Sequence, residues 1–240
     1  MTQTRRLSSG LINRQRPLNF KFDGKKFSGY QGDTLASALL ANGGQLMGRS
    51  FNYHRPRGPF TSGSEEPNAI VELREGARKE PNTRATTIEL YDDLIAKSQN
   101  RWPSLGFDMM AVNDLFSNFL TAGFYYKTFM WPAAFWEKLY EPIIRRAAGL
   151  GSASLEADPD CYDKGFLHCD LLIIGAGAAG LAAALVTGRA GLDVILADED
   201  FLIGGRLNQE SFSIDDQAGS AFAASTYEAV SYTHLRAHET

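Results

Sequence analysis

Cysteine is scarce in this chain, and its scarcity excludes several kinds of protein. Among the 240 residues there are two cysteines, Cys161 and Cys169, with no others to complete a cysteine-ligated metal or iron–sulfur site. We therefore expect no metal site, no disulfide framework and a reducing, cytoplasmic compartment. Residues 1–15 are polar and lack the apolar segment typical of a secretion signal.

Long hydrophobic runs and an excess of positive charge are also missing. The aromatic-rich stretch 115–136 is interrupted by Asn118, Lys127 and Pro132 before the ~20 apolar residues of a membrane span accumulate. The net charge of −4 gives no general electrostatic reason to bind nucleic acid or an anionic membrane. With 44% hydrophobic residues, the composition is typical of a globular protein with a sizeable core.

What the chain does contain is a glycine motif in a complete structural context. An apolar strand at 171–174 leads into G-x-G-x-x-G, and a helix of small residues follows. In such a motif the first glycine permits a tight turn, the second lets the backbone approach a pyrophosphate, and the third allows close packing of helix on strand. N–H groups at the start of the helix face the anion. The predicted phosphate contacts are Gly175, Gly177, Ala178, Ala179 and Gly180.

An acidic residue completes the motif. A second apolar strand, 193–197, ends at Asp198, which follows Gly180 by 18 residues. An acidic side chain at that place accepts hydrogen bonds from the adenosine ribose hydroxyls. Because it would also repel a 2′-phosphate, the sequence favours NAD or FAD over NADP. Glu199 and Asp200 add negative charge beside it.

The first hundred residues predict a β-grasp domain. Alternating apolar residues around Asp23-Gly24 indicate a hairpin over 18–30. A helix follows over 34–41, with Asp33 expected as its N-cap and Asn42-Gly43 as its C-cap. Strands are expected at 69–73 and 85–90 with a turn at 80–83 between them, which would complete the sheet near residue 95.

The expected fold class is α+β followed by α/β. We divide the chain into a β-grasp domain (1–100), a helical, aromatic-rich connector and linker (101–160), and the start of a Rossmann-type FAD/NAD(P)-binding domain (161–230). In the connector, positions 135, 139, 143 and 147 would share one side of a helix. Residues 231–240 neither continue a βαβ unit nor finish a sheet, so we expect an artefactual tail on a truncated domain.

Several sequence words, more specific than the glycine motif, resemble one protein family. They are GDTLASALLANG (32–43), YHRPRG (53–58), EPNA (66–69), EPNTRAT (80–86) and KTFMWP (127–132). Over about residues 18–211 the chain resembles the N-terminal part of the alpha subunit of bacterial heterotetrameric sarcosine oxidase. The resemblance implies a β-grasp domain related to [2Fe–2S] ferredoxins but without the cluster, and the loop after Gly43 has no cysteine.

The resemblance also implies cofactors, partners and a reaction. The alpha subunit would hold noncovalent NAD, with a tetrahydrofolate-binding domain further along the chain. FAD would belong to the beta subunit, covalent FMN would lie near the alpha–beta junction, and gamma and delta subunits would complete the complex. The substrate would be a small amine: sarcosine is demethylated with O₂ to glycine, H₂O₂ and formaldehyde or methylene-tetrahydrofolate.

Carried onto this sequence, the resemblance assigns cofactor contacts and no catalytic residue. The NAD contacts would be the three motif glycines with Ala179, then Asp198, Glu199, Asp200, Gly205 and Arg206. An arginine at position 206 suits a pyrophosphate, although a surface arginine is an equally good interpretation. His54 is expected to be a hydrogen-bonded loop histidine.

Two other interpretations stay open at this point. The chain could be a subunit of a related FAD-dependent enzyme, such as an opine- or proline-type dehydrogenase or a cyanide-forming synthase, which passes electrons onward without making peroxide. Alternatively, it could be a dinucleotide-binding scaffold without chemistry. The words FMWP (129–132) and RPR (55–57) and the cysteine-free loop favour the sarcosine oxidase family.

Overall fold

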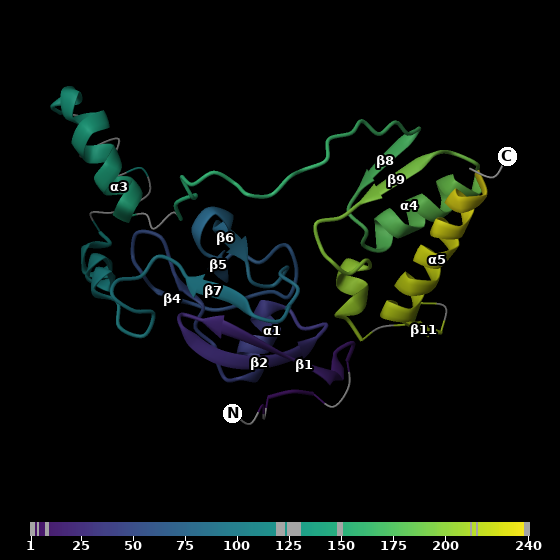
Figure 1. Ribbon diagram of the computed structural model, residues 1–240, viewed down its shortest axis with the longest axis horizontal. Coiled ribbons are helices and arrows are strands. Elements are labelled where there is room, and N and C mark those ends of the chain that lie inside the picture. Colours follow the sequence, from purple (N-terminus) through teal and green to yellow (C-terminus); the bar gives the residue numbers. More distant parts are fainter. Residues whose placement is uncertain are drawn as a thin grey trace. The chain divides into compact units, whose positions relative to one another are not determined.

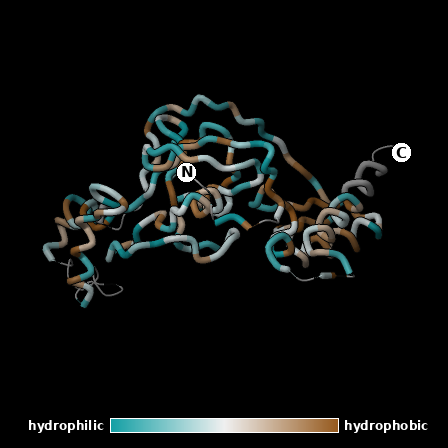
Figure 2. The backbone as a smooth tube through the Cα atoms, turned by 90° about the horizontal axis from the view of Figure 1, so that it is seen from below, coloured by the Kyte–Doolittle hydropathy of each residue, from teal (hydrophilic) through white to brown (hydrophobic). Residues whose placement is uncertain are grey.

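The computed structural model describes residues 3, 5–7, 10–118, 123, 131–147, 151–211, 213–214 and 216–237, without the side chains of 146–147 and 231–237. It forms two compact units, Met1–Thr61 with Glu65–Pro159, and Ser62–Ser64 with Asp160–Thr240 (Figure 1). Hydrophobic and hydrophilic segments alternate along the chain in both units (Figure 2).

Unit 1 is built on a five-stranded mixed sheet with the order β2-β1-β7-β5-β6. Strand β1 pairs in parallel with β7, and the other neighbouring pairs are antiparallel. The elements are β1 (Asn13–Phe22), β2 (Lys25–Gln31), α1 (Leu35–Ala41), β5 (Ile70–Leu73), β6 (Glu80–Arg84) and β7 (Leu94–Ser98). A hairpin, a helix and a returning strand that pairs in parallel with the first strand define the predicted β-grasp fold.

The core of unit 1 lies between α1 and one face of this sheet. Leu35 and Leu39 of the helix pack in one buried cluster with Phe20, Val71 and Leu94 of three strands, and each of these five side chains is at most 1% exposed. Burial of this apolar surface is what orders the sheet and helix together.

The predicted hairpin and the predicted helix end are confirmed. Asp23 and Gly24 both have positive φ (49° and 76°), as a two-residue turn of the hairpin type requires. Asn42 is the C-cap of α1, and Gly43 follows it in the left-handed region at φ 87°.

The predicted N-cap of α1 is wrong by one residue. Thr34 caps the helix: its hydroxyl accepts from the Ser37 N–H, and the Ser37 hydroxyl accepts from the Thr34 N–H, both at 3.0 Å. Asp33 is instead fully buried, and its carboxylate accepts two hydrogen bonds from the Arg6 guanidinium at 2.9 and 2.6 Å. The Asp33 side chain, which the local pattern assigned to the N-cap, forms a long-range ion pair with Arg6 instead.

Two predictions for the following segments are also wrong. The expected turn at 80–83 lies within strand β6, which is irregular there: Asn82 has a positive φ of 61°, and the register with β5 shifts. Residues 85–90 form a turn and an isolated bridge position instead of a strand. The strand that returns to β1 is β7, which the sequence analysis missed.

Short elements join the sheet to the connector. The loop after α1 contains β3 (Gly48–Arg49) and β4 (Pro56–Arg57), and η1 (Gly76–Arg78) lies between β5 and β6. The described part of the connector contains short, irregular helices: η2 (Met109–Phe116), η3 (Ala133–Phe135), a π-helical η4 (Trp136–Tyr140) and α3 (Glu141–Ala147). Residues 101–108 and 151–160 form no helix. Most of the aromatic stretch from 119 to 130 lies outside the described residues.

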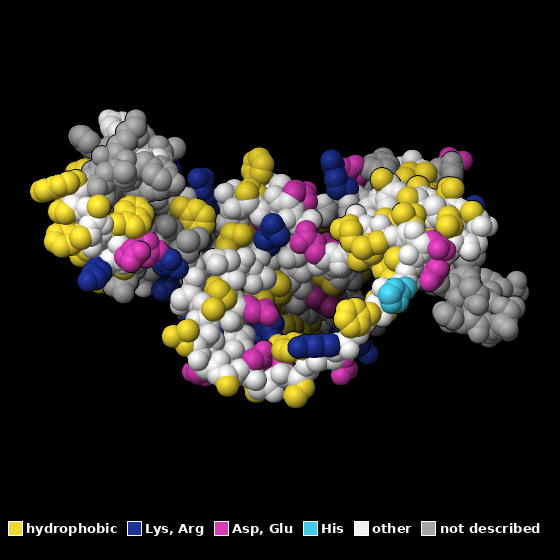
Figure 3. All heavy atoms as spheres, turned by 90° about the horizontal axis from the view of Figure 1, so that it is seen from above, with side chains coloured by type: hydrophobic (Ala, Val, Ile, Leu, Met, Phe, Trp, Pro, Cys, Tyr) yellow, Lys and Arg dark blue, Asp and Glu magenta, His cyan; other side chains and the backbone are white. Residues whose placement is uncertain are grey.

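The connector exposes large apolar side chains. Leu115 and Trp131 are 81% and 83% exposed, and Figure 3 shows hydrophobic side chains on the surface of this segment. No helix in the described part of the chain combines the length and the apolar character needed to cross a bilayer.

Unit 2 begins a Rossmann-type fold. Its elements are β8 (Leu171–Ile174), α4 (Ala178–Arg189), β9 (Val194–Ala197), η5 (Gly205–Asn208), β10 (Ser213–Ile214), β11 (Gln217–Ala218) and α5 (Gly219–Ala237). Strands β8 and β9 are parallel and in register from Leu171↔Val194 to Ile174↔Ala197. Buried residues of α4 and α5 pack with Val194 and Leu207, whereas Leu172 and Ile174 on the other side of β8 are 55% and 76% exposed.

Candidate functional site

The glycine motif forms the turn between β8 and α4, as its sequence predicts. Gly175 has a φ of 99°, which L side chains rarely adopt, and its N–H donates to the carbonyl of Ala197 at 2.7 Å. A Cβ on Gly180 would lie 1.8 Å from the carbonyl oxygen of Gly175. Both positions therefore require glycine for the turn and for the close approach of α4 to the strand.

The second glycine of the motif, Gly177, borders open space. Gly177 is the N-cap of α4, and a Cβ there would meet no atom within 4 Å. The first intrahelical bond runs from the Leu181 N–H to the Gly177 carbonyl at 2.9 Å. The N–H groups of Ala178, Ala179 and Gly180 precede it, so helix geometry leaves them without an intrahelical acceptor. The open space at Gly177, the N–H donors of the first turn of α4 and the positive end of the helix dipole together suit an anion.

Asp198 lies beside this turn because β8 and β9 end at the same edge. One of its carboxylate oxygens accepts from the Ala176 N–H, and the other accepts from the Asp200 N–H at 2.8 Å. The side chain is exposed, and each carboxylate oxygen keeps further lone-pair capacity. Asp198 can therefore hold the glycine turn and still accept hydrogen bonds from a ribose.

The two following acids lie in different environments. Glu199 is exposed and Asp200 is half-buried. Burial raises the pKa of Asp200, and the charges of Asp198 and Glu199 raise it further, against hydrogen bonds from the N–H groups of Phe201 and Leu202 that lower it. The negative charge at this strand end would oppose a 2′-phosphate.

A second glycine turn contacts the first. The Gly204 N–H donates to the carbonyl of the buried Ala176 at 2.9 Å, and a Cβ on Gly205 would come within 3.4 Å of the Gly177 Cα. Both glycines have positive φ, 121° and 50°. The structure therefore places Gly205 beside the glycine motif, as predicted, and it adds two residues, Gly204 and Ala176. In the sequence, Gly204 could have been found from the Gly-Gly pair, and Ala176 from its place inside the motif.

Arg206 forms an ion pair with a residue of its own segment. Its guanidinium pairs with Glu210 one helical turn further along, and its side chain is 78% exposed. The arrangement matches the interpretation of Arg206 as a surface arginine, although an exposed guanidinium can change rotamer at little cost.

The residues present fit the ADP half of a dinucleotide. The open space at Gly177, the free N–H groups of α4 and the exposed Asp198 would hold pyrophosphate and ribose. This half is common to NAD and FAD, so the cradle alone does not separate them. Within the described residues no group of three His, Cys, Asp or Glu side chains could hold a metal ion.

Buried polar groups in unit 1 organise loops. His54 is 2% exposed, and its Nδ1 lies 2.7 Å from an Asp108 carboxylate oxygen, which confirms a hydrogen-bonded loop histidine. Glu66 is 1% exposed and accepts from the N–H groups of four residues, Phe60, Thr61, Asn68 and Ala69. Burial raises the pKa of Glu66, but these four donors together outweigh it and hold the pKa below its ordinary value of 4.5.

The two units match two known families of oxidoreductase domains. Residues 15–101 match the family described as a 2Fe-2S iron-sulfur cluster binding domain, and residues 170–234 match the family described as FAD dependent oxidoreductase. The chain therefore combines a ferredoxin-like domain with a region of the FAD-dependent oxidoreductase type.

Comparison of the whole chain with curated proteins is more specific. The chain is 63% identical over 226 residues to sarcosine oxidase subunit alpha of Rhizobium meliloti, covering 94% of this chain and 23% of that relative. It is 32% identical to the same subunit of Corynebacterium strain U-96, covering 100% of this chain and 20% of the relative. The chain is thus homologous to sarcosine oxidase alpha subunits, which confirms the resemblance, and it spans less than a quarter of their length.

Among solved structures, L-proline dehydrogenase from P. horikoshii matches 90% of this chain and 32% of its own, with a TM-score of 0.49 and 18% sequence identity. At that identity the likeness says nothing about substrate or cofactor.

Proposed function

We propose that this chain is the NAD-binding N-terminal segment of a sarcosine oxidase alpha subunit. The observation that carries the proposal is the cradle of Gly175, Gly177 and Gly180 with Asp198 beside it, in a chain 63% identical to such a subunit. The chain's own residues bind and orient the cofactor: α4 presents N–H groups to the pyrophosphate, and Asp198 accepts from the ribose.

The choice of NAD over NADP rests on charge, and the choice of NAD over FAD rests on the resemblance to the alpha-subunit family. Asp198, Glu199 and Asp200 follow one another at the end of β9, where a 2′-phosphate would meet like charge. FAD is the second candidate, because residues 170–234 match FAD-dependent oxidoreductases and because FAD shares the ADP half with NAD.

The proposed complete enzyme demethylates sarcosine. Sarcosine, O₂ and water give glycine, formaldehyde and H₂O₂, or the one-carbon unit leaves as methylene-tetrahydrofolate. The partners are beta, gamma and delta subunits, with FAD in the beta subunit, FMN near the alpha–beta junction and tetrahydrofolate held by a later part of the alpha chain. A flavin supplies the two-electron oxidation of the amine when bound. We assign no catalytic acid, base or nucleophile to this segment.

We also propose that unit 1 keeps the ferredoxin-like fold without a [2Fe–2S] cluster. Residues 1–160 contain no cysteine, and cysteine thiolates are the ordinary ligands of such a cluster. An iron assay on the purified chain after anaerobic reconstitution tests this: iron and labile sulfide at two each per chain would overturn it.

Isothermal titration of the chain with NAD, NADP and FAD tests the cofactor assignment. We expect NAD to bind at least about tenfold more tightly than NADP, which corresponds to about 1.4 kcal/mol. Tighter binding of FAD than of NAD would replace NAD by FAD, and binding of none of the three would overturn the dinucleotide site.

A separate experiment tests the enzyme assignment. The full-length alpha subunit is assembled with its partner subunits, and H₂O₂ is measured after sarcosine addition. Peroxide formation that needs the alpha subunit supports an oxidase. Flavin bleaching by sarcosine that is unchanged when the alpha subunit is omitted would point to a scaffold.

A further inference from the structure

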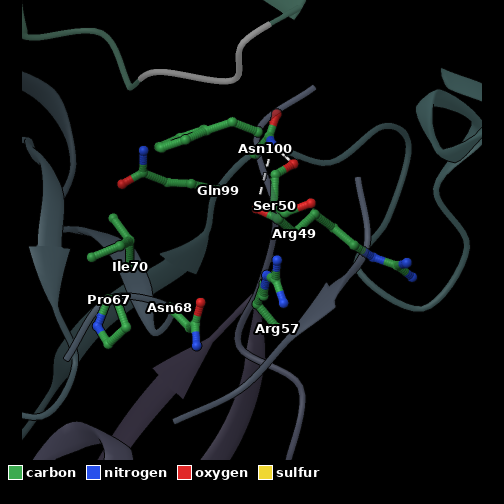
Figure 4. A pocket seen from close by; sticks show the side chains of 9 residues that line it. Arg49, Ser50, Arg57, Pro67, Asn68, Ile70, Gln99 and Asn100 are labelled. Carbon is green, nitrogen blue, oxygen red and sulfur yellow. Dashed lines mark hydrogen bonds between the residues drawn. The ribbon is translucent and has the colours of Figure 1, made fainter. Parts of the chain in front are cut away.

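A small pocket of about 140 Å³ opens on unit 1, away from the glycine motif in the sequence. Figure 4 shows the side chains that line it, from β3, β4 and the loop between them, from the start of β5 and the residues before it, and from the segment after β7. They are Arg49, Ser50, Phe51, Arg57, Pro67, Asn68, Ile70, Gln99 and Asn100. None of the dinucleotide contacts proposed above is among them.

The polar side of the pocket carries a cation and no carboxylate. Arg57 is half-buried, and its guanidinium makes no hydrogen bond or ion pair with any residue that the structure describes. The Arg49 guanidinium, by contrast, donates to the carbonyls of Leu105 and His54. No Asp or Glu lines the pocket. The Arg57 guanidinium is thus available to donate to an anion.

Arg57 and Asn68 are held on a fixed backbone. Arg57 lies in β4, where it pairs with Gly48 of β3, and its carbonyl accepts from the Met47 N–H at 2.9 Å. The Asn68 N–H donates to the buried Glu66 carboxylate at 2.7 Å. The Asn68 carboxamide has no partner among the described residues and adds two N–H donors. The backbone therefore fixes where these two side chains begin, on neighbouring parts of the pocket wall.

The other side of the pocket is apolar. Phe51, a residue that is 52% exposed, lines it together with Pro67 and Ile70. A cavity of about 150 Å³ lined by apolar side chains holds a benzene-sized molecule. The pocket therefore has room for one ring with an anionic group toward Arg57. A zwitterionic amino acid suits it poorly, because its ammonium would find no carboxylate.

We propose that this pocket binds a small monocarboxylate with a ring-sized apolar body. The carboxylate accepts hydrogen bonds from the fork of the Arg57 guanidinium and from the Asn68 amide, while the body contacts Phe51, Pro67 and Ile70. The proposal is independent of the nucleotide site, since it uses residues of unit 1 alone.

Benzoate is the probe, and its binding to the full chain is measured by isothermal titration. We expect saturable binding at one site, weakened about tenfold to 100-fold by Arg57→Gln, as expected for loss of a charged hydrogen-bonding partner. Arg57→Lys keeps the charge without the fork and should recover part of the affinity. Arg55→Gln is the matched control, because Arg55 pairs with Asp114 and does not line the pocket.

Benzylamine and inorganic phosphate separate the two halves of the argument. Benzylamine has the ring with the wrong charge, and phosphate has the charge without the ring, so each should bind at least about tenfold more weakly than benzoate. Equal binding of benzoate to the parent chain and to a folded Arg57→Gln or Arg57→Lys variant would overturn the proposal, as would no binding to the parent chain. Tighter binding of phosphate than of benzoate would overturn the assignment to a ring carboxylate.

Discussion

The carbonyl oxygen of Gly175 lies where a side chain at Gly180 would have to be, only 1.8 Å from the position of a Cβ. This contact fixes the distance between α4 and the end of β8. The helix N-terminus is thereby held at the edge where Asp198 also lies.

Gly180→Ala should therefore destabilise unit 2. The backbone carbonyl cannot move aside without opening the turn, so we expect a loss of about 1–3 kcal/mol in the free energy of unfolding, typical of overpacking. Urea denaturation measures it. Gly165→Ala is the control, because a Cβ there meets no atom within 4 Å. Equal stability of the two variants would contradict the close packing described here.

Gly177→Ala should separate binding from stability. A Cβ at Gly177 meets nothing within 4 Å, and the φ of −73° is ordinary for alanine, so the fold should tolerate it. The methyl group would occupy the space proposed for the pyrophosphate, and we expect about tenfold or greater loss of NAD affinity in isothermal titration. An unchanged affinity would show that no phosphate approaches this turn.

Asp198→Asn should weaken NAD more than NADP. The amide has one acceptor oxygen for the N–H groups of Ala176 and Asp200, which now share two, and it removes a charge near the ribose. We expect NAD to bind about tenfold more weakly and the preference over NADP to shrink, measured by titration with both nucleotides. Glu228→Gln, a change at an exposed position of α5, controls for net charge. A preserved preference would rule out Asp198 as the discriminating residue.

Glu66 should make the stability of unit 1 depend on pH. Its pKa is lowered in the folded chain from an ordinary 4.5, so its contribution is fully present above that value and is lost as pH falls through the lowered pKa. Glu66→Gln should cost about 2–3 kcal/mol at pH 7, because an amide cannot accept from all four N–H donors.

Urea denaturation from pH 7 to pH 3 measures this dependence. The gap between the parent chain and Glu66→Gln should narrow as the pH falls below 4.5. The control Glu65→Gln, at an exposed position, should show no such gap. A gap that stays constant with pH would mean that the carboxylate charge of Glu66 contributes nothing.

Local pattern was sufficient where a residue's neighbours in sequence decide its conformation. Gly175, Gly177 and Gly180 could be assigned because turn, cradle and helix packing all arise within six residues. The Asp23-Gly24 hairpin and the Asn42-Gly43 helix end are local in the same way. Asp33 was misassigned because its partner, Arg6, is 27 residues away in the chain.

The amino-acid sequence by itself determined the first hairpin and helix of the β-grasp domain, the βαβ unit with its glycine turn, and the homology to sarcosine oxidase alpha subunits, since these rest on short-range spacing and shared sequence segments. Tertiary structure alone decided that Pro81 and Asn82 continue a strand, that β7 closes the sheet against β1, and that Arg206 turns to Glu210. It also decided that Arg57 and Phe51 face one pocket with residues after β7. Those outcomes depend on which segments, distant in sequence, pair and pack together. Strand pairing is set by which side chains become buried in the folded chain, and a short stretch of sequence does not show this.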